Sequence, residues 1–126
     1  MSELASERLV VLVVEDEFMI RAATAEAIRD AGFEVLEAAN ADQAIVILED
    51  RGDIRVVFTD IHMPGSMDGA KLAHAIKDRW PPVRVIATSG RVAVDNLDLP
   101  DGTMLFPKPY RFDHIARTLR ALTAAS

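Results

Sequence analysis

Five short apolar runs alternate with segments of mixed polarity along the chain. The runs are rich in β-branched residues and mostly continuous, which is typical of strands buried on both faces of a parallel sheet. The second run partly alternates between apolar and polar residues, which predicts an edge strand. In chain order, the runs cover Leu9 to Val14, Phe33 to Ala38, Ile54 to Thr59, Val83 to Thr88 and Thr103 to Phe106.

Apolar residues at helical spacing occupy most of the intervals between these runs. Gly32 closes the first expected helix, and Asn40 is placed to cap a second helix over Ala41 to Asp50. Pro81 and Pro82 follow the third. The apolar positions are Ile20, Ala23, Thr24, Ala27, Ile28 and Ala31 in the first helix, Leu72, Ala73 and Ile76 in the third, and Phe112, Ile115, Leu119 and Leu122 in the last. Strands that alternate with helices predict an open parallel sheet covered on both faces.

One interval, from Arg91 to Gly102, is short for a full helix. It contains Asp95, Asn96 and Pro100, which are poor residues for a helix interior. We therefore expect about five helices, of which the fourth is short or frayed.

Composition and charge narrow the class of protein. The chain has 126 residues, of which 50% are hydrophobic, so a single domain over 8–126 with an N-terminal extension over 1–7 is expected. The net charge of -6 argues against a nucleic-acid or membrane surface, and the absence of cysteine excludes disulfides and thiol chemistry. No signal peptide or run of about 20 apolar residues is present, which predicts a cytoplasmic protein.

Polar residues follow the expected strands at their carboxyl ends, which lie together at one edge of a parallel sheet. Glu15 and Asp16 come after the first run, Asp60 after the third, Ser89 after the fourth and Lys108 after the fifth. Ligands of open α/β sheets bind outside this edge. We therefore expect three carboxylates, a hydroxyl and a lysine to converge there, although they are scattered through the sequence.

The chemistry of such a set is that of phosphoryl transfer. Clustered carboxylates repel one another unless a cation joins them, and oxygen ligands suit a hard ion such as Mg2+. A carboxylate beside that ion can attack phosphorus to form an aspartyl-phosphate, while the metal and a lysine balance the charge of the transferring group. A serine hydroxyl can hydrogen-bond a phosphoryl oxygen.

Four motifs give this interpretation a family. The segments VVEDE, VFTDIHMPGSMDG, TSG and KPY, each at the end of an expected strand, resemble the receiver domain of two-component response regulators over roughly residues 8 to 124. The resemblance implies an α/β, flavodoxin-like (CheY-like), doubly wound sheet of five parallel strands in the order 2-1-3-4-5. It also implies a phosphoacceptor switch of a phosphorelay rather than an enzyme.

The resemblance assigns a role to each residue at this edge. Asp60 is implied as the phosphoacceptor, Ser89 as the switch residue and Lys108 as the phosphate-binding lysine. The implied Mg2+ ligands are Asp16 directly, Glu15 through water, Asp60 and the backbone carbonyl of His62. Thr88 is the rival of Ser89, and alternation along the strand favours Ser89. For the His62 side chain, exposure to solvent is favoured over metal ligation.

Partners are implied in the same way. The phosphoryl donor is a sensor histidine kinase or a phosphotransfer protein, and the output passes through contact with a downstream protein target, because only one helix is expected after Lys108. We expect a monomer or weak dimer. The residues depart from the common pattern in Glu15 for an aspartate, in one extra residue in MPGSMDG, and in Leu105 where many relatives have an aromatic switch residue.

Three other functions fit these residues less well. An aspartyl-nucleophile phosphatase needs a second acid two residues after the nucleophile, where this chain has His62. A phosphorylation-independent binding module with the same fold would be expected to lose the acid pair, the serine or the lysine, and all are present. A flavin or nucleotide carrier is poorly supported, because no glycine-rich loop follows the first strand.

Overall fold

The computed structural model describes residues 9–63, 67–90 and 98–124. Five parallel strands form one sheet in the order β2-β1-β3-β4-β5, which confirms the expected fold and strand order. The strands are β1 (Val10–Val14), β2 (Glu34–Ala38), β3 (Ile54–Asp60), β4 (Arg84–Ser89) and β5 (Met104–Pro107). The helices of the described residues are α2 (Phe18–Asp30), α3 (Ala41–Asp50), α4 (Gly69–Arg79) and α5 (Phe112–Ala124).

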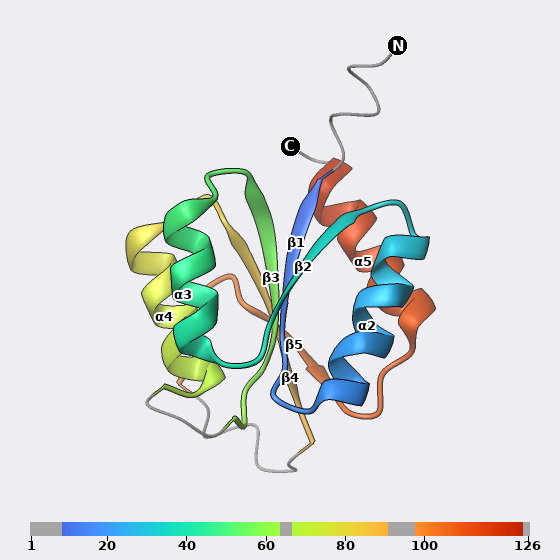
Figure 1. Ribbon diagram of the computed structural model, residues 1–126, viewed down its shortest axis with the longest axis horizontal. Coiled ribbons are helices and arrows are strands. Elements are labelled where there is room, and N and C mark those ends of the chain that lie inside the picture. The colour runs from blue at the N-terminus through green and yellow to red at the C-terminus, as the bar shows by residue number, and fades with distance from the viewer. Residues whose placement is uncertain (1–8, 64–66, 91–97, 125–126) are drawn as a thin grey trace.

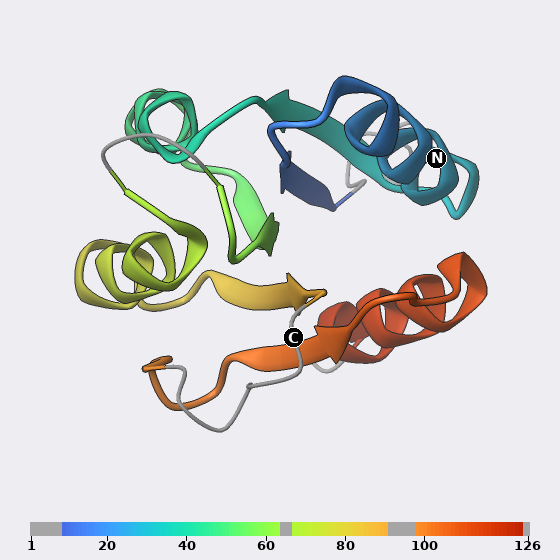
Figure 2. The ribbon, with the colours of Figure 1, turned by 90° about the horizontal axis from the view of Figure 1, so that it is seen from below.

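Helices cover both faces of the sheet, with α3 and α4 on one side and α2 and α5 on the other (Figures 1 and 2). The side chains of β1 show why its apolar run is continuous. Val10, Leu12 and Val14 belong to the core under α3 and α4, whereas Val11 and Val13 belong to the core under α2 and α5. Successive side chains of a strand point to opposite faces, so a strand between two helix layers must be apolar throughout.

The ends of the helices follow the local signals in the sequence. The Asn40 side chain accepts a hydrogen bond of 2.8 Å from the Gln43 backbone N–H at the start of α3. Gly32, with a φ of 105°, follows the C-terminal end of α2 in a conformation that other residues rarely adopt. Both expectations are confirmed, as is the edge position of β2.

The segment expected to hold a short or frayed helix falls largely on residues 91–97, which lie outside the described residues. Residues 98–102, which follow, are not helical. Two side chains of α4 form hydrogen bonds with residues 98–102. His74 Nε2 donates to the Asp98 carbonyl oxygen at 2.8 Å, and Lys77 Nζ donates to the Asp101 carbonyl oxygen at 2.9 Å. Among the described residues no helix is both long and apolar enough to cross a membrane.

The packing of α4 against β3 fixes the edge where the polar residues gather. Gly69 opens the helix, and its backbone N–H donates to the Ile61 carbonyl oxygen at 2.8 Å. A Cβ atom on Gly69 would collide with the Asp60 carbonyl oxygen. Only glycine therefore allows the first turn of α4 to lie directly on the end of β3.

Candidate functional site

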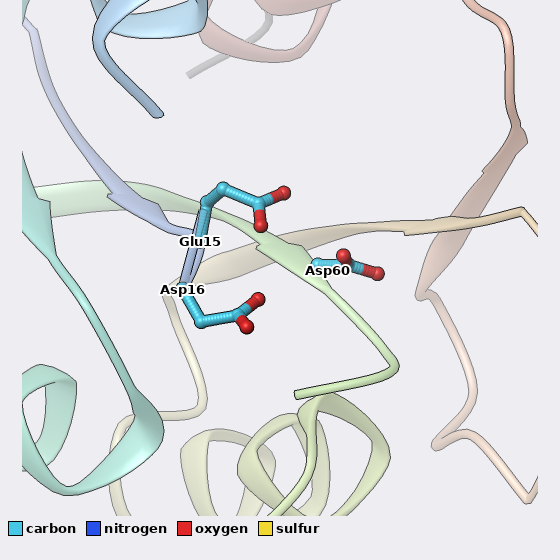
Figure 3. Close-up of side chains that lie close together, drawn as sticks. All are labelled: Glu15, Asp16 and Asp60. Carbon is cyan, nitrogen blue, oxygen red and sulfur yellow. The ribbon is translucent and has the colours of Figure 1, made fainter. Parts of the chain in front are cut away.

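Three carboxylates from the ends of β1 and β3 lie side by side (Figure 3). One oxygen of each of Glu15, Asp16 and Asp60 lies within 4.8 Å of one of each of the others. Glu15 and Asp60 are only 6% and 7% exposed, whereas Asp16 is exposed. The topology therefore brings together the acid pair and the strand-end aspartate, which are far apart in the sequence.

Backbone contacts hold Glu15 at the end of β1. Its N–H donates to the Ala38 carbonyl oxygen at 3.1 Å, which extends the pairing with β2, and Arg21 NH1 donates to its carbonyl oxygen at 2.9 Å. The Glu15 Oε2 atom accepts a hydrogen bond from the Glu17 N–H at 3.0 Å. Glu17 is also the N-cap of α2, and its side chain accepts a hydrogen bond from the Ile20 N–H at 2.9 Å.

Burial gives Glu15 an unusual affinity for protons. Loss of solvent is the largest effect and raises the pKa of Glu15 to about 7, together with the negative charge of Asp60 and a hydrogen bond with Asp16; the hydrogen bond from the Glu17 N–H, the second-largest effect, and the charge of Lys108 oppose the rise. The ionised form of a buried carboxyl group is disfavoured until a cation compensates it. A fraction of the molecules near neutral pH therefore holds a proton on Glu15 in the absence of such a cation.

Lys108 supplies the one ammonium group near these carboxylates among the described residues. Its Nζ atom donates to Asp60 Oδ2 at 3.0 Å and lies 3.8 Å from Glu15 Oε1. Burial lowers the pKa of Lys108, but the hydrogen bond and charge of Asp60, together with the charge of Glu15, raise it overall. The lysine therefore stays protonated and faces the carboxylate oxygens.

Ser89 and His62 complete the surroundings of Asp60. The His62 N–H donates to Asp60 Oδ1 at 3.2 Å, and a hydrogen bond of 3.2 Å joins His62 Nε2 to Ser89 Oγ. The register of the sheet pairs Asp60 with Thr88, so that Ser89 is the last residue of β4, one position further toward the edge. His62 is exposed, as expected, and its contact with Ser89 was not anticipated.

Two other features near this edge were missed by the sequence interpretation. Gly69 stands in the VFTDIHMPGSMDG motif, but its close packing against the Asp60 carbonyl oxygen was not predicted. A glycine at the first position of a helix is the signal that could have indicated this packing. Tyr110 packs edge-on against Phe58, with ring centroids 5.6 Å apart, and its hydroxyl lies 3.4 Å from Thr24 Oγ1. The spacing of Tyr110 after Lys108 could not reveal its partners.

An apolar hollow of about 530 Å³ lies beside Lys108. It is formed by the start of α2 and the segment that leads into α5, and three large hydrophobic side chains that line it are exposed: Met19 (70%), Ile20 (41%) and Phe112 (44%). Such a grouping of exposed apolar side chains at one place is typical of a surface that contacts another protein.

Comparison with known proteins assigns the family. The model of the response regulator receiver domain matches residues 11–101. The receiver domain of the hybrid histidine kinase CckA has a crystal structure with a TM-score of 0.75 and 31% identity, covering 90% of this chain and 97% of that one. A receiver domain protein from Clostridium thermocellum has a TM-score of 0.85 and 26% identity, covering 93% and 95%. The chain belongs to the response regulator receiver family.

Curated relatives are much longer than the matched region. The sensor kinase CckA of Brucella abortus is 31% identical over 116 residues, which are 89% of this chain and 12% of the kinase. A putative NtrX-like response regulator of Rickettsia bellii is 40% identical over 86 residues, which are 68% of this chain and 18% of that protein. The chain thus spans less than a fifth of either relative.

Proposed function

We propose that this receiver domain is a phosphoacceptor switch in which Asp60 takes a phosphoryl group from a phosphohistidine. An oxygen of the Asp60 carboxylate attacks phosphorus, the O–P bond forms as the P–N bond to the donor imidazole breaks, and the imidazole leaves. The observation that carries the proposal is the arrangement around Asp60, in which a buried carboxylate at a strand end faces an ammonium group at 3.0 Å and a second buried carboxylate.

Mg2+ fits the donor set of this site. The available donors are all oxygens, from Glu15, Asp16 and Asp60, with the backbone carbonyl of His62 as a further expected ligand. The raised pKa of Glu15 supports the assignment, because a cation would relieve the cost of ionising it. Bound Mg2+ would neutralise charge on the transferring phosphoryl group.

Lys108 and Ser89 have complementary parts in the proposed reaction. The Lys108 ammonium, already within hydrogen-bonding distance of Asp60, would pair with a phosphoryl oxygen and stabilise the transition state. The Ser89 hydroxyl would bind another phosphoryl oxygen and so favour the active conformation, as a shift in population between two states. Output then passes through protein contacts that distinguish these states.

The donor is proposed to be a sensor histidine kinase or a phosphotransfer protein. Such a partner must bring its phosphohistidine to the carboxyl edge of the sheet. The exposed Met19, Ile20 and Phe112 line the hollow beside Lys108, and an apolar contact there would place the donor next to Asp60. Phosphotransfer from a protein donor should therefore depend on these side chains, whereas phosphorylation by a small donor should not.

Intact-mass spectrometry after incubation with acetyl phosphate and Mg2+ tests the proposal. We expect a mass increase of one phosphoryl group that disappears on treatment with hydroxylamine, which cleaves acyl phosphates. Omission of Mg2+ should prevent the increase. A correctly folded protein that gains no phosphoryl group under these conditions would contradict the proposal and favour a phosphorylation-independent binding module.

A further inference from the structure

Four hydrogen bonds form a closed ring around the Asp60 carboxylate. Its Oδ1 atom accepts from the His62 N–H at 3.2 Å, and the His62 side chain bonds the Ser89 hydroxyl at 3.2 Å. The Ser89 carbonyl oxygen accepts from the Lys108 N–H at 2.8 Å, and Lys108 Nζ returns to Asp60 Oδ2 at 3.0 Å. Every residue of the ring contacts its two neighbours through different atoms.

His62 contacts both the Asp60 carboxylate, the proposed phosphoacceptor, and the Ser89 hydroxyl, the proposed switch group. Its backbone is bound to the carboxylate, while its imidazole is bound to the hydroxyl of a serine that is only 1% exposed. The imidazole itself lies on the exposed side of the site, so that it can swing into solvent without opening the core. The bond between His62 and Ser89 can therefore break at little structural cost.

We propose that His62 is a positioning residue that retains the Ser89 hydroxyl in the unphosphorylated state. This inference rests on the proposed phosphoacceptor function. In the proposed unphosphorylated state, the Ser89 hydroxyl donates its proton to His62 Nε2. A hydroxyl has a single proton to donate, so a phosphoryl oxygen on Asp60 must take that proton away from the imidazole. His62 thereby sets how strongly phosphorylation must act before the switch responds.

The expected size of this effect follows from the strength of the hydrogen bond between His62 and Ser89. A neutral hydrogen bond contributes a net free energy that corresponds to about a threefold to tenfold change in an equilibrium constant. Loss of the imidazole should therefore shift the population toward the active conformation by that factor. The same loss should have no effect once the Ser89 hydroxyl is absent, because the two groups act through one bond.

A double-mutant cycle with beryllofluoride, a phosphoryl mimic, tests this coupling. The affinity of the protein for beryllofluoride in saturating Mg2+ is measured by fluorine NMR for wild type, His62→Phe, Ser89→Ala and the double variant. Phenylalanine keeps the ring and removes both nitrogens. We expect about threefold to tenfold tighter binding for His62→Phe, weaker binding for Ser89→Ala, and no further change when His62→Phe is added to Ser89→Ala.

Two further variants separate positioning from a general structural effect. His62→Gln offers an amide near the position of Nε2 and should return the affinity toward the wild-type value. His74→Phe alters another partly exposed histidine, one that bonds Asp98 rather than a residue of the ring, and should leave the affinity unchanged. Thermal melting of each variant shows that it is folded.

The possible outcomes distinguish a failure of the proposed role of His62 from a failure of the phosphoacceptor function. Additive effects of His62→Phe and Ser89→Ala, or weaker binding in His62→Phe alone, would overturn the role of His62 while leaving the phosphoacceptor function intact. Absence of beryllofluoride binding and of phosphorylation in the wild-type protein would overturn both. Tighter binding in His62→Phe that requires the Ser89 hydroxyl supports the proposal.

Discussion

Two clusters of charged side chains at opposite ends of the strands show how burial changes the behaviour of carboxylates that lie beside a cation. We call them the carboxyl-end cluster, made of Glu15, Asp60 and Lys108, and the amino-end cluster, made of Glu34, Arg51 and Asp53. Each combines two carboxylates with one cation. By distance alone the amino-end cluster is the tighter, because Arg51 NH2 lies 2.7 Å from Asp53 Oδ2, whereas Lys108 Nζ lies 3.0 Å from Asp60 Oδ2.

The two clusters differ more in the burial of their carboxylates than in these distances. The side chain of Asp53 is 53% exposed, and that of Asp60 is 9% exposed. Hydrogen bonds from Arg51 lower the pKa of Asp53, whereas loss of solvent raises the pKa of Glu15 to about 7. The exposed cluster is already satisfied by its own arginine and by water. The buried cluster retains negative charge that its single lysine does not balance, which a cation such as the proposed Mg2+ would compensate.

Removal of the two aspartates should give the largest contrast between the clusters. We expect Asp60→Asn to abolish phosphorylation by acetyl phosphate, because an amide is a poor nucleophile, and Asp53→Asn to be phosphorylated like wild type. Intact mass measures both. Stoichiometric labelling of Asp60→Asn at another site would show that Asp60 is not the phosphoacceptor.

Removal of the two cations should give the next largest contrast. Lys108→Ala takes away the ammonium group that balances the transferring charge, and the initial rate of phosphorylation should fall by about 100-fold. Arg51→Ala should leave that rate unchanged, since exposed ion pairs contribute little and this one lies at the far edge. A wild-type rate in Lys108→Ala would remove the lysine from the reaction.

Metal binding should distinguish the clusters by thermal stability. Mg2+ at ten times its dissociation constant should stabilise the folded state by about 1.4 kcal/mol, or about 5 °C in melting temperature, by binding only the assembled carboxylates. Asp16→Asn should melt higher than wild type in EDTA, because repulsion is relieved, yet respond less to Mg2+. Asp53→Asn should keep the full response. An unchanged Mg2+ shift in Asp16→Asn would place the ion elsewhere.

The pH dependence of unfolding should have opposite signs at the two ends. The pKa of Glu15 is raised from 4.5 to about 7 in the folded state, so the folded state binds more protons between these values. In EDTA the free energy of unfolding should therefore fall as the pH rises through this window. The fall should be at least about 1 kcal/mol, because a pKa shift of one unit corresponds to about 1.4 kcal/mol.

Two variants identify the groups responsible for that pH dependence. Glu15→Gln should remove the fall, as measured by urea denaturation in EDTA at about pH 5 and pH 8. The pKa of Asp53 is lowered, so its contribution is present above its ordinary pKa of 3.8 and is lost as the pH falls through the folded-state value. Asp53→Asn should therefore act only in acid. A pH slope that persists in Glu15→Gln would assign it to another group.

The sheet could be predicted closely from the sequence because its strands are buried on both faces. The run from Ile54 to Thr59 became a strand over Ile54–Asp60, and the run from Val83 to Thr88 became Arg84–Ser89. A continuous apolar run of this length is typical of a strand that is buried on both faces, and Glu34 and Glu37 mark β2 as one of the two edge strands. The order of the strands came from the resemblance of the motifs to a family.

The site could be predicted as a set of residues but not as a network. Parallel topology is enough to gather Glu15, Asp60, Ser89 and Lys108 at one edge, and their roles in phosphorylation remain predictions. The bond between His62 and Ser89 depends on a rotamer and on the register of two strands, and a histidine after a strand gives no sign of its partner. Contacts between side chains that lie far apart in the sequence require coordinates.

The glycine that begins α4 has a consequence for how this family can change its sequence. Because the Gly69 N–H is bound to the Ile61 carbonyl oxygen, the chain between them leaves and returns at fixed points. The one residue by which MPGSMDG exceeds the common pattern lies between these two fixed points. A change in the length of the chain between Ile61 and Gly69 should therefore leave the position of Asp60 unchanged.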